Sequence, residues 1–309
     1  MKQIATLLFV LYIPACTSAQ STYTIAAIDR PTDAAVPVPT ISSTVVDGLS
    51  SSGQAIVVGN TDRTFMDATV EGLWVGAPGA MQLLAADDTA APGTDADTYF
   101  AVYDVFSFQQ QAANWTIGAG GDAVLMAPLQ GPNVGTNKFG VWAGKPGALE
   151  LIAREGGSAP GTAAGSTFTR ISEEVAAGLP GPAVNASGQV AFSASVVAAS
   201  GQSLGGGIWV GRPGSLQMEA GRAGALINDK GEVAYQGTGG IWTGLPGATK
   251  LAVPLREPAP GLPGVTNAVV NGQLAFNNAG HVAFYATLSG AVGLTNNLAL
   301  WLRRARRRL

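Results

Sequence analysis

The fold of this chain is decided by one short phrase, which in its clearest copy is Gly207-Ile-Trp-Val-Gly-Arg-Pro-Gly214. Three more copies keep the glycines, the tryptophan and the proline. They are Gly72-Leu-Trp-Val-Gly-Ala-Pro-Gly79, Gly140-Val-Trp-Ala-Gly-Lys-Pro-Gly147 and Gly240-Ile-Trp-Thr-Gly-Leu-Pro-Gly247, and a shortened copy, Leu298-Ala-Leu-Trp301, ends the series. A phrase that recurs along one chain indicates tandem copies of one structural unit.

A second phrase precedes each copy of the first and sets the length of the unit. It is clearest in Asn185-Ala-Ser-Gly-Gln-Val-Ala-Phe192 and Asn277-Asn-Ala-Gly-His-Val-Ala-Phe284. Its glycines are Gly53, Gly121, Gly188, Gly231 and Gly280, and they precede Trp74, Trp142, Trp209, Trp242 and Trp301 by 21, 21, 21, 11 and 21 positions. This nearly constant offset predicts five repeats, of which the fourth is shortened.

The third repeat predicts four antiparallel strands. They are expected at 165–173, 189–197, around 207–210 and at 215–218, with Gly, Pro and Asn residues in the turns between them. In the second strand, Val190 and Phe192 face one way and the small Ala191 and Ser193 face the other, so we expect neighbours to cover both faces. Four strands in 67 positions favour a β-propeller blade over a β-helix coil, which needs only about 20–30 residues.

We therefore expect an all-β chain that forms a β-propeller of about five four-stranded blades. The fourth blade is expected to be abbreviated, because only 33 positions separate Trp209 from Trp242 and leave no room for a separate first strand. The last repeat stops three strands in, at Trp301. Residues 23–30 resemble the fourth-strand segment at 149–155, so an N-terminal strand would close the ring and remove two free edges. A less regular two-sheet arrangement of the same hairpins is the alternative.

The two phrases resemble the NxxGxxAF tandem-repeat family of secreted bacterial proteins, which belong to the choice-of-anchor type. The resemblance covers about residues 41–302. The full motif is matched by Asn185, Gly188, Ala191 and Phe192 and again by Asn277, Gly280, Ala283 and Phe284, whereas the fourth repeat has Tyr235 in place of Phe and the first two keep clearly only the glycine. The family implies no known activity and no catalytic residues. This chain also lacks the apolar span that a C-terminal sorting anchor would need before the final arginines.

The N-terminus has the pattern of an export signal. Lys2 precedes a mostly apolar stretch at 4–13 and small residues at 15–19. The stretch is too short to span a bilayer roughly 30 Å thick, and a buried N-terminal helix is the alternative. We expect a signal peptide at 1–19, a repeat domain at 20–302 and a basic tail at 303–309, in a protein that is secreted or held in the cell envelope.

Cys16 is the only cysteine and lies inside this signal. Ile13-Pro-Ala-Cys16 resembles a bacterial lipobox, so Cys16 is either lipidated or removed with the signal. Contact with a membrane is expected only in the first case. The rest of the chain has no thiol, which excludes disulfides, thiolate metal sites and cysteine nucleophiles there.

Charge argues against a nucleic-acid-binding protein. Charged residues are 12% of the chain, about half the usual roughly 25%. Without Lys2 and the five arginines of the tail, 11 basic residues remain against 20 acidic ones, a net charge of −9. An acidic body repels phosphate backbones, and the arginine tail is either a solvated end or a contact for anionic lipid. We expect a monomer.

The residues of catalytic and metal chemistry are scarce. His281 is the only histidine and occupies the position after the motif glycine, where the other repeats have Gln54, Asp122, Gln189 and Glu232. We interpret it as a solvent-facing turn residue, and a His-based triad or multi-His zinc site is not available. The glycine-rich stretches lack a following Gly-Lys-Ser/Thr, so no phosphate loop is predicted. We expect no cofactor and no metal.

Carboxylates are the one chemical group present in numbers. Acidic or Arg-acidic steps precede each Ala-Pro-Gly segment, and we take Asp87, Arg154, Glu155, Arg256 and Glu257 as candidate ligand-binding residues on one face of the ring. Arg–carboxylate pairs that hold loops in place are the alternative. The expected function is a non-enzymatic binding or scaffolding module for an extracellular ligand or envelope component. The competing hypothesis is a carbohydrate-active enzyme that uses paired carboxylates, and a third is a structural envelope component. The repeated tryptophans are expected to be core.

Overall fold

The computed structural model describes residues 43–65, 68–77, 79–101, 114–135, 138–171, 181–290 and 297–304. Within these ranges the chain forms strands and no helix. The first sheet contains β1 (Ser43–Leu49), β2 (Ala55–Phe65), β3 (Ala68–Gly76) and β4 (Gln82–Ala86). The second contains β5 (Tyr99–Phe100), β6 (Asn114–Ile117), β7 (Ala123–Gln130), β8 (Phe139–Lys145) and β9 (Ala148–Arg154).

The remaining strands form three further sheets. The third contains β10 (Thr167–Arg170), β11 (Ala183–Val184), β12 (Val190–Val197), β13 (Ser203–Gly211) and β14 (Gln217–Glu219). The fourth contains β15 (Gly221–Ile227), β16 (Val233–Gly237), β17 (Gly240–Gly244) and β18 (Lys250–Pro254). The fifth contains β19 (Thr266–Phe276), β20 (Val282–Ser289) and β21 (Leu298–Arg303).

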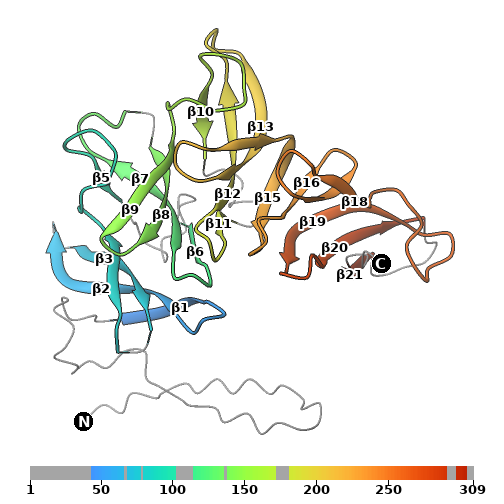
Figure 1. The fold of residues 1–309 in the computed structure, drawn as a ribbon, viewed down its shortest axis with the longest axis horizontal. Coiled ribbons are helices and arrows are strands. Elements are labelled where there is room, and N and C mark those ends of the chain that lie inside the picture. The colour runs from blue at the N-terminus through green and yellow to red at the C-terminus, as the bar shows by residue number, and fades with distance from the viewer. Residues whose placement is uncertain are drawn as a thin grey trace, which may run out of the picture.

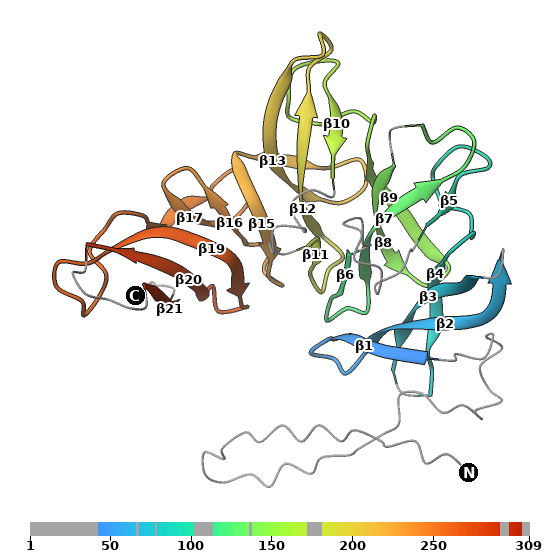
Figure 2. The ribbon, with the colours of Figure 1, turned by 180° about the vertical axis from the view of Figure 1, so that it is seen from behind.

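The five sheets, called blades one to five below, fan out in an arc that follows the order of the chain (Figure 1). Blades one and five lie at its two ends, and the reverse view shows the same order (Figure 2). All strand pairs within the blades are antiparallel, and most join sequence neighbours. In blades two and three, both strands before the central hairpin pair with its first strand: β5 and β6 pair with β7, and β10 and β11 pair with β12. The predicted class, an all-β propeller-type fold of about five four-stranded blades, is therefore confirmed, and the two-sheet alternative is not found. The predicted closing strand at residues 23–28 lies outside the described residues.

The predicted strands of blade three lie close to the observed ones, whereas the prediction that blade four lacks a separate first strand is wrong. Blade four has a separate first strand, β15, which pairs with β16 along its length. Only Ala220 separates β15 from the last strand of blade three. The repeat is therefore shortened in its linker and in its loop between strands two and three, and keeps four strands. Blade five has three strands in the described residues, as predicted.

The geometry of blade three explains why its phrase needs its glycines. A Cβ on Gly207 would lie 3.0 Å from the Trp209 ring, so the first glycine makes room for the indole. A Cβ on Gly211 would collide with the carbonyl oxygen of Ser215, across the turn. Gly214, at the end of this turn, has a φ of 72°, which a side chain disfavours. At each of these three glycines, a side chain is disfavoured for a different steric reason.

The core lies between consecutive blades. The Phe192 and Trp209 face of blade three packs against Met126 and Val141 of blade two, whereas Ala191 on the opposite face packs with residues of blade four. Both faces are covered, as predicted. Trp74, Trp142 and Trp209 are fully buried. Trp242 and Trp301 are partly buried and pack against the core clusters that blade four shares with blades three and five.

Candidate functional site

Of the predicted charged residues, only Asp87 and Glu155 occupy equivalent positions in their turns. Asp88 and Arg256 have φ angles of 60° and 63°, and Gly156 has one of 79°. These three residues therefore mark the same position in the turns after β4, β18 and β9. In this alignment Asp87 and Glu155 correspond to Leu255, and Glu257 corresponds to Gly157 and Thr89. An acid therefore recurs only in blades one and two, at Asp87 and Glu155, and the Arg-Glu pair of blade four is offset by two residues from that of blade two.

Glu155 is a buried structural residue. Only 6% of it is exposed. Its Oε2 accepts hydrogen bonds from the backbone N–H groups of Lys138 (3.0 Å) and Phe139 (3.3 Å), and its Oε1 accepts one from Ile171 (3.0 Å). A buried carboxylate bound to three amides connects blade two to the end of β10 in blade three. Glu155 is therefore unavailable to a ligand from solvent.

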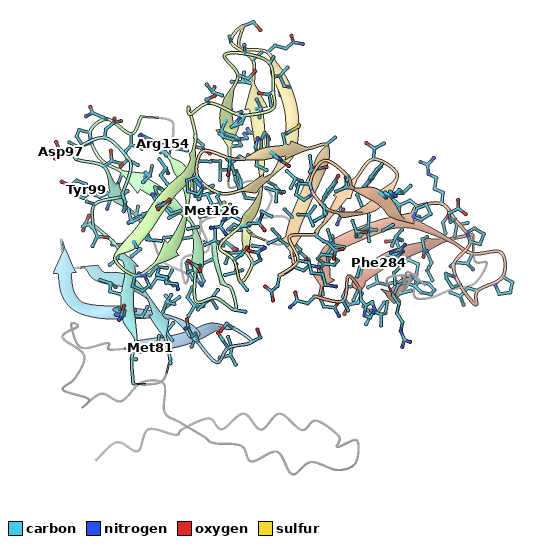
Figure 3. The ribbon with its side chains drawn as sticks, in the orientation of Figure 1. Met81, Asp97, Tyr99, Met126, Arg154 and Phe284 are labelled. Carbon is cyan, nitrogen blue, oxygen red and sulfur yellow. The ribbon has the colours of Figure 1, made fainter. Side chains whose placement is uncertain are left out.

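The other predicted residues lie on separate blades and differ in exposure. Arg154 donates to Asp95 at 3.3 Å, and Asp95 is 73% exposed. Figure 3 places Arg154 near Asp97 and Tyr99 in blade two. Asp87 is half-buried after β4, and Arg256 and Glu257 are exposed after β18 in blade four. The structure therefore does not bring the five predicted residues together.

A second buried acid, Glu219, is also fully engaged. Its Oε2 accepts hydrogen bonds from Tyr235 Oη (3.2 Å) and Thr249 Oγ1 (3.0 Å), and its Oε1 accepts one from the Gly247 amide. Burial raises the pKa of Tyr235, the Thr249 hydrogen bond lowers it, and the Glu219 carboxylate raises it further. This network attaches the β17–β18 turn of blade four to the last strand of blade three.

The motif asparagines form a ladder from blade to blade. Asn185 Oδ1 accepts hydrogen bonds from the amides of Ser187 (3.1 Å) and Gln189 (2.9 Å), which closes the NxxG turn. Its Nδ2 donates to the carbonyl of Asn228 in the next blade (3.1 Å), and Asn228 donates in turn to that of Asn277 (3.2 Å). These turns lie on the inner side of the arc (Figure 1). The motif therefore joins blades.

The position after the motif glycine is half-buried in every blade, and in blades three and four it belongs to this ladder. Asn185 donates to Gln189 Oε1 (2.9 Å), and Asn228 donates to Glu232 Oε2 (2.8 Å). His281 is half-buried at the same position, so the expected solvent-facing turn residue is partly covered. Blade two differs, because Gly118 stands where the asparagine would be and no amide side chain there can hold Asp122.

Asp122 opens into a cleft of ≈ 500 Å³ between blades two and three. Blade two contributes Asp122, Lys145, Glu150 and the small floor residues Ala143 and Ala148, and blade three contributes Ser187, Gly188 and Arg212. Arg212 donates a hydrogen bond to the Ser187 carbonyl. A Cβ on Gly188 would lie 3.7 Å from Asp122 Cγ and 3.8 Å from Arg212 Nη1. The acid and the guanidinium therefore converge on this glycine.

The cleft combines two basic and two acidic side chains. Lys145 and Arg212 occupy the variable position of Gly-x-Pro-Gly, where the first and fourth repeats have Ala77 and Leu245. Sequence reasoning missed them because it followed the constant positions of the repeat. A usable signal was present at the variable positions, since two neighbouring copies of this turn are both basic there. Such a site can bind polar groups of both signs.

The described residues contain no group of three or more His, Cys, Asp or Glu side chains placed to hold a metal ion. No helix in the described part of the chain is long and apolar enough to cross a membrane.

A family model described as a family of unknown function, DUF7453, matches residues 20–221 and again 218–307. The chain belongs to this family. The two DUF7453 matches overlap where β14 of blade three meets β15 of blade four, the junction without a linker. They do not test the resemblance to the NxxGxxAF family, which stays a prediction.

Other comparisons add little. No curated protein matches the chain. A solved structure, Penicillium chrysogenum α-L-arabinanase complexed with arabinobiose, is similar over 90% of this chain and 97% of that chain, at 10% identity and a TM-score of 0.24. A likeness at this TM-score supports no conclusion about this DUF7453 member.

Proposed function

We propose that the chain is an exported, non-enzymatic binding or scaffolding module whose ligand contacts lie in the cleft between blades two and three. The observation that supports this is the convergence of Asp122 and Arg212 on Gly188, in a cavity of ≈ 500 Å³. The buried acids Glu155 and Glu219 are already bound to amides or hydroxyls. By contrast, Lys145 and Arg212 are exposed and Asp122 is half-buried, and all three line the cleft.

The chemistry of the cleft favours a polar ligand with groups of both signs. Lys145 and Arg212 suit a carboxylate or phosphate, and Asp122 and Glu150 suit an ammonium or hydroxyl group. A saccharide or peptide of the cell envelope that has both kinds of group would fit this description. We place the protein outside the cell or in its envelope on the basis of the predicted signal peptide.

Binding to saccharides of equal length tests the proposal. The panel contains neutral, acidic, amino, and combined acidic and amino members, and affinity is measured by calorimetry. We expect the combined members to bind best and the double variant Lys145→Ala/Arg212→Ala to lose at least about tenfold in affinity, since each tenfold step is about 1.4 kcal/mol. The matched control is Arg256→Ala/Glu257→Ala, at an exposed pair in blade four, which should bind as the parent does.

Two outcomes would overturn the proposal. If the control variant loses affinity and the cleft variant does not, the ligand site lies on the charged turns instead. If the purified protein hydrolyses a member of the panel, and changing one carboxylate abolishes this, the protein is an enzyme. Both variants must retain the parent's unfolding temperature, because Arg212 also bonds the Ser187 carbonyl.

A further inference from the structure

We propose that the outer edge of β21 is the docking site for a segment of this same chain, residues 23–28, which pairs antiparallel with β21 as the fourth strand of blade five. The sequence pattern suggested this pairing, and three separate observations in the described residues now support it and assign its register. The inference does not depend on the proposed ligand cleft.

The first observation is the exposure of β21. The third strands of blades one to three, β3, β8 and β13, each contain at least four consecutive buried residues. In β21, by contrast, Leu298, Leu300 and Leu302 are 47%, 63% and 60% exposed. Within the described residues, blade five also has three strands where the others have four or more. These three leucines share one face of the strand. The backbone edge of β21 has no partner strand among the described residues, and an open edge favours the addition of another strand.

The second observation is the register that three other blades share. In blades one, two and four, the residue before the phrase tryptophan lies opposite a small or β-branched residue of the fourth strand, in the pairs Leu73↔Ala85, Val141↔Ala153 and Ile241↔Val253. In these three blades the fourth strand then ends one residue later. Blade three, where Ile208 lies opposite Glu219, is the exception. The stretch Ile25-Ala-Ala-Ile-Asp-Arg30 aligns with Leu83-Leu-Ala-Ala-Asp-Asp88 and Leu151-Ile-Ala-Arg-Glu-Gly156. This alignment places Ala27 opposite Leu300.

The chain length between the elements also agrees. The end of a fourth strand precedes the next first strand by 13 positions from β4 to β5, 13 from β9 to β10, and 12 from β18 to β19. From Ile28 to the start of β1 the distance is 15 positions. The DUF7453 match begins at residue 20 and so includes this segment.

The third observation concerns the indole N–H groups. Trp142 and Trp209 donate to the carbonyls of Pro92 (2.8 Å) and Pro160 (3.0 Å), each in the linker that enters its own blade. Trp74 is fully buried, yet its Nε1 has no acceptor among the described residues. The linker into blade one would be the chain that follows residues 23–28, and it contains Pro31, Pro37 and Pro39.

A designed disulfide tests the pairing. Ala27→Cys/Leu300→Cys is introduced into the full chain with Cys16→Ser, so that no other thiol is present. Directly opposed residues of an antiparallel pair are close enough for a disulfide. We expect mild oxidation to link the pair within a monomer, seen by mass and by reduction-sensitive gel mobility. The matched control, Ala27→Cys/Leu204→Cys, uses a similarly exposed leucine on β13 and should not link. No link in the test pair, or a link only between two chains, would overturn the proposal.

A truncation gives a second readout. The variant lacking residues 20–30 should unfold at a lower temperature than the parent, because the edge of blade five stays open. A synthetic peptide of residues 20–30 added to this variant should raise the unfolding temperature, and a scrambled peptide should not. Equal unfolding temperatures of the truncated and parent proteins would contradict the docking. Neither readout uses a ligand, so failure here is distinguishable from failure of the proposed binding function.

Discussion

Blades three and four share the same phrase but place its tryptophan differently. In blade three, Trp209 is fully buried, meets Phe168 edge-on at 4.9 Å between ring centroids, and stacks with Phe192 at 6.1 Å. Its indole N–H donates to the Pro160 carbonyl. In blade four, Trp242 is half-buried and donates instead to the Thr238 carbonyl of its own hairpin at 3.0 Å.

The cause of this difference is the linker. Ala159-Pro-Gly161 precedes blade three and supplies the acceptor, whereas blade four follows after Ala220 alone. Without a linker carbonyl the Trp242 indole lies over Gly237, where a Cβ would be 2.7 Å from its ring. Tyr235 replaces the phenylalanine, and its hydroxyl joins the Glu219 and Thr249 network. A repeated phrase therefore determines the strand and turns, while its neighbours determine where the large side chain goes.

Replacing each of the two tryptophans singly is expected to give the largest difference in stability between blades three and four. Trp209→Ala should lower the free energy of unfolding by about 3–5 kcal/mol, because it empties a fully buried site. Trp242→Ala should cost about 1–2 kcal/mol, since its indole is partly solvated already. Urea denaturation of both variants and the parent measures this. Equal losses would contradict the view that the linker seats the tryptophan.

Disrupting the Glu219 network is expected to have the next largest effect on stability, and this network exists only where blade four lacks the linker. Glu219→Ala should cost about 2–4 kcal/mol, because it leaves the buried Tyr235 hydroxyl, the half-buried Thr249 hydroxyl and the Gly247 amide with fewer partners, at about 1–3 kcal/mol for a buried unsatisfied group. Glu257→Ala is the control at an exposed position of the same blade and should change stability by no more than about 0.5 kcal/mol. Thermal unfolding of the two variants and the parent measures these effects. If Glu219→Ala loses no more stability than Glu257→Ala does, the network does not stabilise the fold.

The asparagine ladder predicts a smaller contrast between an inner blade and the end of the arc. Asn228 is buried and bonds to blade five, whereas Asn277 is exposed, with no blade after it in the described residues. Asn228→Ala should cost about 2 kcal/mol and Asn277→Ala about 1 kcal/mol or less, since Asn277 only closes its own turn. Chemical denaturation checks the order, and the reverse order would be evidence against inter-blade bonding.

The smallest expected effect is a change of protein stability with pH that is caused by Tyr235. Blade three has Phe192 at the same position. Burial raises the pKa of Tyr235 in the folded protein, so the unfolded chain releases this proton first, near its usual pKa of about 10. The stabilising contribution is complete below about pH 10 and decreases as pH rises toward the folded pKa. The unfolding free energy of the parent should fall more steeply above pH 10 than that of Tyr235→Phe. Parallel curves for the two proteins would rule this out.

Local rules allowed much of the fold to be predicted. The glycines, prolines and asparagines of the two phrases have conformational preferences of their own, so Gly188 and Gly214 form turns whatever surrounds them. Alternation along residues 190–197 predicted a strand with two covered faces, and the cores of blades two to four confirm it. The three strands of blade five were predicted because the last repeat reaches its third strand at Trp301.

The candidate site could not be predicted in the same way. Equivalence of the charged turns was inferred from order along the chain, but the turn position depends on the residue with positive φ, and this separates Glu155 from Glu257. Burial of Glu155 also depends on amides of β8 and the end of β10, which are far from one another in sequence.

The sequence by itself determined the number of blades, the strands of most of them and the turns that join them, because those depend on residues close together in the chain. Only the tertiary structure decided that Trp242 turns away from the position of Trp209, that Glu155 is buried, and that Asp122 and Arg212 face one cleft. Each of these outcomes depends on the partner that a neighbouring blade presents. That partner is a property of packing between repeats and is not encoded within any single repeat.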